Sequence, residues 1–213
     1  MTQQVPPVRR RVRLTPEQRL AQILDAAVHL VARHGFSAVS LQDVAREVGL
    51  TQAGLLHHVG SKDGLLELLV SHLYDRSGTP DDYLATGDPA ATHPDGLSLP
   101  GYFRFLVGFN AARPELMRLY TVLGAEASSP EHPAHGYFAD RPEQVWEFYQ
   151  GFTWRLPPEV GPFAGQRDLV EMTIQAMDGL QLRSFRRPAI DLVTEWARFE
   201  RLLYPAPVWD GYR

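Results

Sequence analysis

The segment Ser40–Leu65 constrains the fold of this chain more than any other stretch of it. Leu41, Val44, Ala45 and Val48 recur there at the i, i+3, i+4 and i+7 spacing that lines apolar side chains along one face of a helix. We therefore expect a short amphipathic helix with this face turned toward a core.

Both ends of that helix carry the residue types that helix ends require. Ser40 suits the N-cap position, and Asp43 stands three residues later, where a capping-box carboxylate would lie. Gly49 is placed to end the helix in a left-handed conformation. Thr51 then caps a second short helix, whose inward-facing apolar residues are Leu55, Leu56 and Val59.

The junction between these helices has the residues that a tight crossing needs. Ala45 is small enough for close approach, Gly49 allows the turn, Leu50 is expected to be buried at the hinge, and Leu55 would fill the angle. Two short helices joined in this way are typical of a helix-turn-helix.

Composition narrows the class of protein. A chain of 213 residues with 44% hydrophobic content can bury one sizeable core or two small ones. The absence of cysteine excludes disulfides, zinc–thiolate sites and a cysteine nucleophile. No signal-peptide pattern and no apolar run of about 18 residues occur, so we expect a soluble, cytoplasmic protein without a membrane partner.

Charge is divided unevenly along the chain. Residues 1–76 hold nine basic and seven acidic side chains, whereas residues 77–213 hold twelve and eighteen. The basic surplus includes four arginines near the start, Arg9, Arg10, Arg11 and Arg13. They indicate either an ordinary solvated terminus or an arm that follows a DNA backbone or minor groove, and the helix-turn-helix downstream favours the arm.

Helical periodicity and breaks in composition divide the chain. We expect a basic flexible arm over 1–15, a helix-turn-helix domain with a connecting fourth helix over 16–76, a linker over 77–101, a second helical domain over 102–205, and a tail over 206–213. In the second domain, helices are expected over 102–112, from Pro114, over 133–154, over 167–185 and over 188–204. No alternating strand pattern occurs, and the predicted fold is all-α with about nine helices.

The candidate DNA-binding residues lie on the outward faces of the two short helices. They are Ser40, Gln42, Thr51, Gln52, Ala53, Gly54, His57 and His58. Gln52 can read a base edge, while Thr51 and the histidines can reach phosphates. Lys62, the only lysine, stands at the start of the fourth helix, where a cation beside free backbone N–H groups can clamp a phosphate.

The second domain is rich in aromatic residues, with polar groups such as Glu126 scattered on the same helices. Such residues can form either a plain core or a small-molecule pocket, and the pattern alone leaves both open. The candidate pocket residues are Phe103, Leu106, Asn110, Met117, Tyr120, Tyr137, Trp146, Tyr149, Gln175 and Asp178.

Metal binding and catalysis find little support in the motifs. His57 and His58 are adjacent and diverge on a helix, and His132 and His135, beside Glu131, lie at a loop-to-helix junction where surface histidines are common. Neither a nucleotide-binding glycine loop nor a nucleophile elbow occurs. We therefore expect the protein to bind no metal and no cofactor and to have no enzymatic activity.

The stretch from Ile23 to Leu73 resembles the N-terminal domain of the TetR family of transcriptional repressors. The matching elements are Gly35-Phe36, the helix from Ser40 to Ala45, the Gly49-Leu50-Thr51 turn, and Leu55–Val59 running into Ser61-Lys62-Asp63-Gly64-Leu65. Leu56 and Val59 depart from the family's usual tyrosine and phenylalanine, and Ala53-Gly54 from its usual small pair.

The resemblance implies a homodimer that pairs through the helices near 167–185 and 188–204, binds a near-palindromic double-stranded operator, and is released by a small-molecule effector in the aromatic cavity of a ligand-binding and dimerisation domain. Two alternatives stay open from the sequence. One is a DNA-binding architectural or ligand-independent regulator whose second domain only dimerises. The other is a helical enzyme that merely shares the helix-turn-helix.

Overall fold

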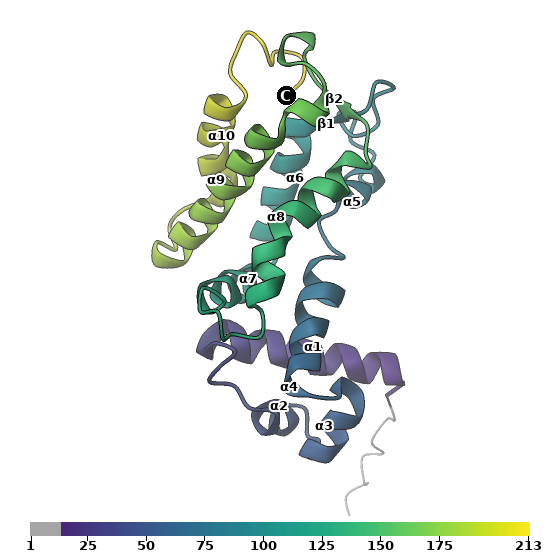
Figure 1. The fold of residues 1–213 in the computed structure, drawn as a ribbon, viewed down its shortest axis with the longest axis vertical. Helices are drawn as coiled ribbons and strands as arrows, with labels where there is room; N and C mark the ends of the chain where they lie inside the picture. The colour runs from purple at the N-terminus through teal and green to yellow at the C-terminus, as the bar shows by residue number, and fades with distance from the viewer. Residues whose placement is uncertain (1–13) are drawn as a thin grey trace, which may run out of the picture.

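The computed structural model describes residues 14–213 as an elongated helical molecule (Figure 1). The predicted arm arginines Arg9, Arg10, Arg11 and Arg13 lie outside the described residues. The helices α2 and α3 lie at one end of the long axis, and α9, α10 and the C-terminus lie toward the other (Figure 1).

The N-terminal part contains four α-helices, as the sequence predicts. They are α1 (Pro16–His34), α2 (Leu41–Glu47), α3 (Gln52–Val59) and α4 (Lys62–Glu67). The predicted N-caps Ser40 and Thr51 each accept a backbone N–H bond at the start of their helices, and Thr15 and Ser61 do the same at α1 and α4. After Glu67 the chain continues as a π-helix, η1 (Leu68–Tyr74), and the wider turn is a common feature of functional segments.

The remaining elements form the second part of the molecule. They are α5 (Pro80–Ala85), β1 (Leu97–Ser98), α6 (Leu99–Ala111), α7 (Pro114–Glu126), α8 (His135–Gln150), β2 (Trp154–Arg155), the 3₁₀ turns η2 (Pro158–Val160) and η3 (Phe163–Gly165), α9 (Arg167–Arg186) and α10 (Leu192–Leu203). The predicted all-α class is confirmed, with one small addition. Leu97 and Ser98 pair in parallel with Trp154 and Arg155, a contact too short to leave an alternating pattern.

Some predicted helix ends need correction. The last helix begins at Leu192 under an Asp191 cap instead of at Pro188, because residues 187–190 form a turn closed by the Ile190 N–H to Arg187 C=O bond. The helix expected over 133–154 ends at Gln150, since Trp154 belongs to β2.

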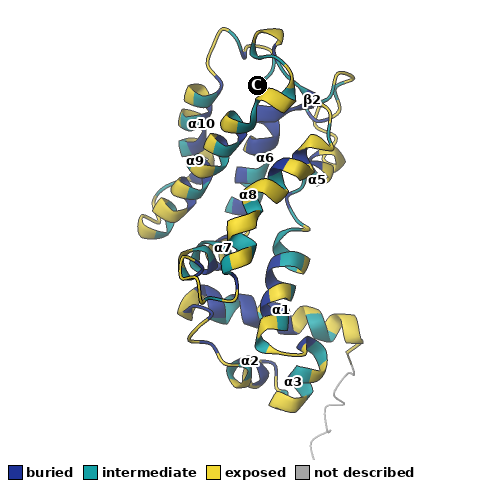
Figure 2. Cartoon of the chain, in the orientation of Figure 1, coloured by how far each residue is buried: buried dark blue, intermediate teal, exposed yellow. Residues whose placement is uncertain are grey.

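Two hydrophobic clusters hold the molecule together, and they appear as dark blue stretches along the helices in Figure 2. The first joins α1–α4 and η1 to the end of α7, through buried Leu119 and Leu123. The second lies among α6, α8, α9 and α10, with Phe103, Trp196 and Tyr204 fully enclosed. Because α7 contributes to both clusters, it ties the two parts of the molecule together.

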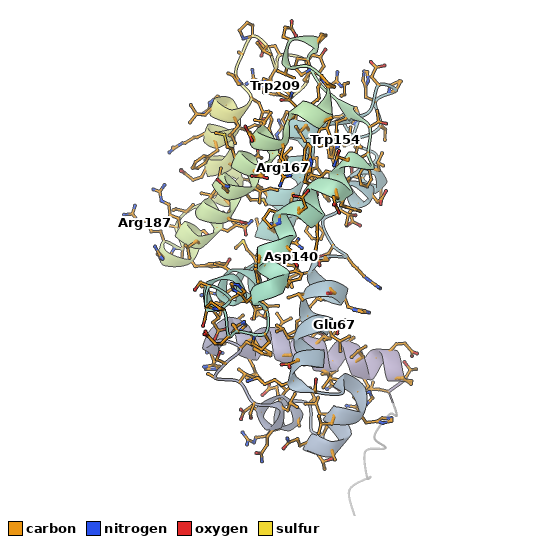
Figure 3. All side chains as sticks on the ribbon, viewed as in Figure 1. Glu67, Asp140, Trp154, Arg167, Arg187 and Trp209 are labelled. Carbon is orange, nitrogen blue, oxygen red and sulfur yellow. The ribbon has the colours of Figure 1, made fainter. Side chains whose placement is uncertain are left out.

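The segments expected as linker and tail have ordered contacts. Residues 77–101 contain α5, β1 and the start of α6, and buried Tyr83 packs into the second cluster. In the expected tail, Trp209 is 2% exposed and packs edge-on against Tyr204. Figure 3 shows Trp209 and Trp154 toward the end of the molecule opposite the helix-turn-helix.

Within residues 14–213, no helix is long and apolar enough to cross a membrane.

Candidate DNA interface and ligand cavity

The helix-turn-helix is built as its sequence requires. Ala45 and Leu55 are 1% and 0% exposed, so the small and the large side chain meet inside the crossing. Gly49 has φ +66°, a left-handed conformation that other residues rarely adopt. Leu50 and Leu56 are half-buried, so neither is enclosed as the sequence led us to expect, although Leu50 packs against the first cluster.

The start of α3 presents an exposed surface. Thr51, Gln52, Ala53 and His57 are exposed, and so is Gln42 on α2, while Gly54 and His58 are half-buried. Thr51 Oγ1 accepts the Gly54 N–H at 3.1 Å. The hydroxyls of Thr51 and Ser40 thus serve as helix caps, whereas the side-chain amide of Gln52 has no hydrogen bond among the described residues.

Lys62 is held by the loop between α1 and α2. Its Nζ donates to the Ser37 carbonyl at 3.3 Å and lies 4.7 Å from the centre of the Phe36 ring. A cation over an aromatic face gains electrostatic stabilisation, so this contact fixes the side chain. If Lys62 binds a DNA phosphate, as the sequence predicts, its ammonium group would do so while in contact with Ser37 and Phe36.

Glu126, at the end of α7, joins the second part of the molecule to the same loop. Its carboxylate accepts the Phe36 N–H at 2.7 Å and the Ser37 N–H at 3.2 Å. At Gly35, φ is +83° and an added Cβ would lie only 2.8 Å from Glu126 Oε1, so glycine allows this close approach. The sequence placed Glu126 with the cavity residues, because nothing in its local pattern distinguishes a pocket carboxylate from one that binds a distant loop.

Two adjoining cavities, of about 100 and 260 Å³, lie among η1, α6, α7, α8 and α9. They share five lining residues: Tyr120, Arg141, Val145, Ile174 and Asp178. Their lining includes Tyr74, the last residue of η1, which continues the helix that comes from the helix-turn-helix. The cavities therefore lie where the second part of the molecule meets the helix that comes from the helix-turn-helix.

Most of the predicted pocket residues line these cavities. Leu106, Asn110, Tyr120, Tyr149 and Asp178 line the smaller cavity, and Trp146 and Gln175 line the larger one together with Tyr120 and Asp178. Phe103, Met117 and Tyr137 line neither. Phe103 and Met117 are packed in the second cluster, and the Tyr137 hydroxyl donates to Asp75. The prediction that these three residues line the cavity is therefore wrong.

The structure adds cavity residues that sequence reasoning missed. Tyr74 stacks on Tyr120 with ring centres 4.0 Å apart and nearly parallel. Asp75 forms an ion pair with Arg141 and accepts the Tyr137 hydroxyl at 2.7 Å, while Arg141 Nη1 donates to that hydroxyl at 2.6 Å. The two contacts of Asp75 join residues more than sixty positions apart, so no local pattern could reveal them.

Asp178 is the second carboxylate of the cavities. Burial raises its pKa to about 6, and the nearby Arg141 opposes this rise only in part. Burial likewise raises the pKa of Tyr120 and of Tyr149 to about 12, so both phenols stay neutral at physiological pH. The walls thus combine neutral aromatic rings with the Asp75–Arg141 ion pair, Glu171, which is paired with Arg167, and the weakly acidic Asp178.

The histidines considered as metal ligands have other roles. His132 Nδ1 accepts the Ala134 N–H, and His135 Nδ1 lies 2.8 Å from the Ala127 carbonyl, so both organise the loop before α8. Within residues 14–213, no cluster of three metal-ligating side chains occurs.

The N-terminal part thus has the geometry of a helix-turn-helix, a motif that in DNA-binding proteins places its second helix in the major groove. Comparison with known proteins agrees. Residues 23–69 match the sequence family described as bacterial regulatory proteins, tetR family. The similarity to this family is thus a similarity of the helix-turn-helix segment.

Curated relatives match this domain alone. The HTH-type transcriptional regulators BetI of Paraburkholderia phytofirmans and of Burkholderia thailandensis are each 35% identical over 57 residues. The match covers 27% of this chain and 29% of the length of each relative.

Solved structures resemble the chain over most of its length. A putative transcriptional regulator from Pseudomonas aeruginosa PAO1 has a TM-score of 0.64 at 23% identity, covering 94% of this chain and 97% of its own. The fatty acid degradation regulator FadR from Bacillus halodurans has a TM-score of 0.58 at 19% identity, covering 90% and 96%. NalD, the secondary repressor of the MexAB-OprM multidrug efflux pump in Pseudomonas aeruginosa, has a TM-score of 0.57 at 16% identity, covering 93% and 96%. These likenesses establish the fold.

Proposed function

We propose that this protein is a repressor that leaves a palindromic operator when a small molecule occupies its cavities. The observation that supports the proposal most strongly is that residues at the end of the connecting helix line the smaller cavity. Tyr74 and Asp75 line the smaller cavity, and they end the continuous helical segment that starts at Lys62 beside the helix-turn-helix. A ligand that displaces these residues would move that segment directly.

The contacts around the wall link the cavities to the DNA-binding domain, as a coupling between the two sites requires. Arg141 on α8 binds Asp75, and Tyr120 on α7 stacks on Tyr74. The same helix α7 ends at Glu126, which binds the loop before α2. Occupation of the cavity would act on the DNA-binding domain at two points, through η1 and through α7.

A dimer is part of the proposal, because an operator with two half-sites needs two recognition helices about 34–36 Å apart. Exposed apolar side chains on α9 and α10 support pairing there: Met172, Leu182, Val193 and Leu202. Leu202, at 79% exposed, is the most exposed of the four.

Relatives of the fold fit this reading. NalD is described as a repressor, and EbrR, with a TM-score of 0.54 and 22% identity, as a multidrug binding protein that was solved with imidazole. What those proteins bind does not identify the effector of this chain.

Band-shift assays with the DNA that flanks the protein's own gene test the proposal. We expect one fragment to bind with strong salt dependence, since phosphate contacts release counterions, and its footprint to contain an inverted repeat. The variant Gln52→Ala should lose preference at particular base pairs while retaining non-specific binding. Binding to every fragment with equal affinity would favour an architectural protein, and binding to none would contradict the proposal.

A further inference from the structure

We infer that the effector is a small organic monocation whose positive charge lies beside Asp178 and whose apolar body packs against the aromatic walls. This inference rests on the proposed function, because it names the chemical class of the ligand of the same cavities. Three observations support it: Asp178 is a carboxylate without a partner among residues 14–213, Arg141 is already ion-paired, and the other cavity walls are aromatic and apolar.

Charge balance leaves one carboxylate without a partner. The cavities are lined by four charged side chains, Asp75, Arg141, Glu171 and Asp178. Asp75 is paired with Arg141, and Glu171 with Arg167 at 2.7 Å. Among the residues that the structure describes, Asp178 has neither a hydrogen bond nor an ion pair, although it borders both cavities. A ligand cation would supply the missing counter-charge.

Arg141 is already engaged and is therefore a poor receptor for an anion. It is ion-paired with Asp75 and donates to Tyr137 Oη at 2.6 Å. Its guanidinium also lies 5.3–5.4 Å from the ring centres of Tyr74, Tyr120 and Tyr137. An anionic ligand would have to break the pair with Asp75 and lie close to Asp178, and both effects oppose binding.

The other walls suit a cation with an apolar body. Tyr120 borders both cavities, with Tyr149 in the smaller one and Trp146 in the larger one. Aromatic faces attract cations and accept apolar groups, whereas Val145 and Ile174 add only apolar surface. The larger cavity, at about 260 Å³, lies just below the roughly 300–1,000 Å³ of drug-sized pockets, which favours a small ligand.

The acidity of Asp178 adds a testable linkage. The titratable and charged groups that line the cavities with it are Arg141 and Tyr149 from α8, Tyr74 from η1, Asp75 just after η1, Tyr102 from α6 and Tyr120 from α7, with Glu171 on its own helix. Burial raises the pKa of Asp178 to about 6, and a bound cation would lower that pKa again. Cation affinity should therefore rise as the pH rises from 5 to 7, by about tenfold, because only about one carboxyl in ten is ionised one pH unit below its pKa.

The test uses three probes with the same phenylbutyl body: phenylbutylamine, phenylbutanol and phenylbutyrate. Binding to the full chain is measured by calorimetry at pH 7 and pH 5 without DNA. We expect the amine to bind at least tenfold more tightly than the alcohol and the carboxylate at pH 7, and to lose most of this advantage at pH 5.

Two variants assign the effect to the cavity. Asp178→Asn should abolish both the preference for the amine and its pH dependence, while alcohol binding stays the same, which also shows that the cavity is intact. Asp168→Asn, which removes an exposed carboxylate from the same helix outside the cavities, should change neither. Equal affinity for the amine and the alcohol, or the tightest binding by the carboxylate, would overturn the inference. Since these measurements use no DNA, such a result would leave operator binding as a separate question.

Discussion

At the scale of single residues, Asp178 is a group whose environment opposes its charge. Burial raises its pKa to about 6 from an ordinary value near 4, so the folded protein holds the proton more tightly than the unfolded chain. Its contribution to stability is therefore most favourable below pH 4, falls as the pH rises from about 4 to 6, and is constant above that.

The variant Asp178→Asn should accordingly stabilise the protein at pH 7, by about 1–3 kcal/mol, and have little effect at pH 4. Thermal unfolding at the two pH values measures this. A variant that is less stable than the natural protein at pH 7 would show that the carboxylate has a favourable partner in the absence of ligand.

Glu126 is a residue whose contacts, unlike its sequence context, reveal its role. Glu126→Gln removes the charge and one of two acceptors for the Phe36 and Ser37 N–H groups, and should lower stability by about 1 kcal/mol. Glu115→Gln on the same helix is the control, since its side chain is 62% exposed and pairs only with His29. Equal losses in urea unfolding would contradict a specific contact between the two parts of the molecule.

At the scale of elements, the helix-turn-helix was predictable and the cavity was only partly so. Caps such as Ser40 with Asp43, and the left-handed Gly49, act within a few residues, so local sequence determines them. The Asp75–Arg141 pair depends on how α8 lies against η1, which no short pattern encodes. The burial of Trp209 against Tyr204 is likewise a tertiary contact.

The stability of the helix-turn-helix should depend on the left-handed Gly49 between α2 and α3. Gly49→Ala should destabilise the protein by about 1–2 kcal/mol, because alanine is strained at φ +66°. Gly54→Ala should not, since that residue is helical, although an added Cβ would lie 3.3 Å from Thr51 Oγ1. If both variants unfold at the same denaturant concentration, strain at the left-handed Gly49 does not lower the stability of the Gly49→Ala variant.

At the scale of the whole molecule, the proposed function depends on pairing through α9 and α10. Leu202→Arg places a charge on an exposed apolar position of α10 and should shift the protein toward monomer without unfolding it. Sedimentation measures the fraction of dimer. Ala197→Arg, which places the same charge at another exposed position of α10, tests whether the loss of dimer is specific to Leu202. A monomeric natural protein at micromolar concentration would contradict the proposed dimer.

If the proposed function is right, the cavities and the DNA-binding surface share one equilibrium. Binding equilibria are reciprocal, so a ligand that weakens operator binding by a given factor must itself bind more weakly, by the same factor, when the operator is bound. The most direct measurement is the affinity of the cavity ligand for the protein with and without its operator. We expect the ligand to bind more weakly in the presence of operator, by roughly 5- to 150-fold. Equal affinity in the two states would contradict it.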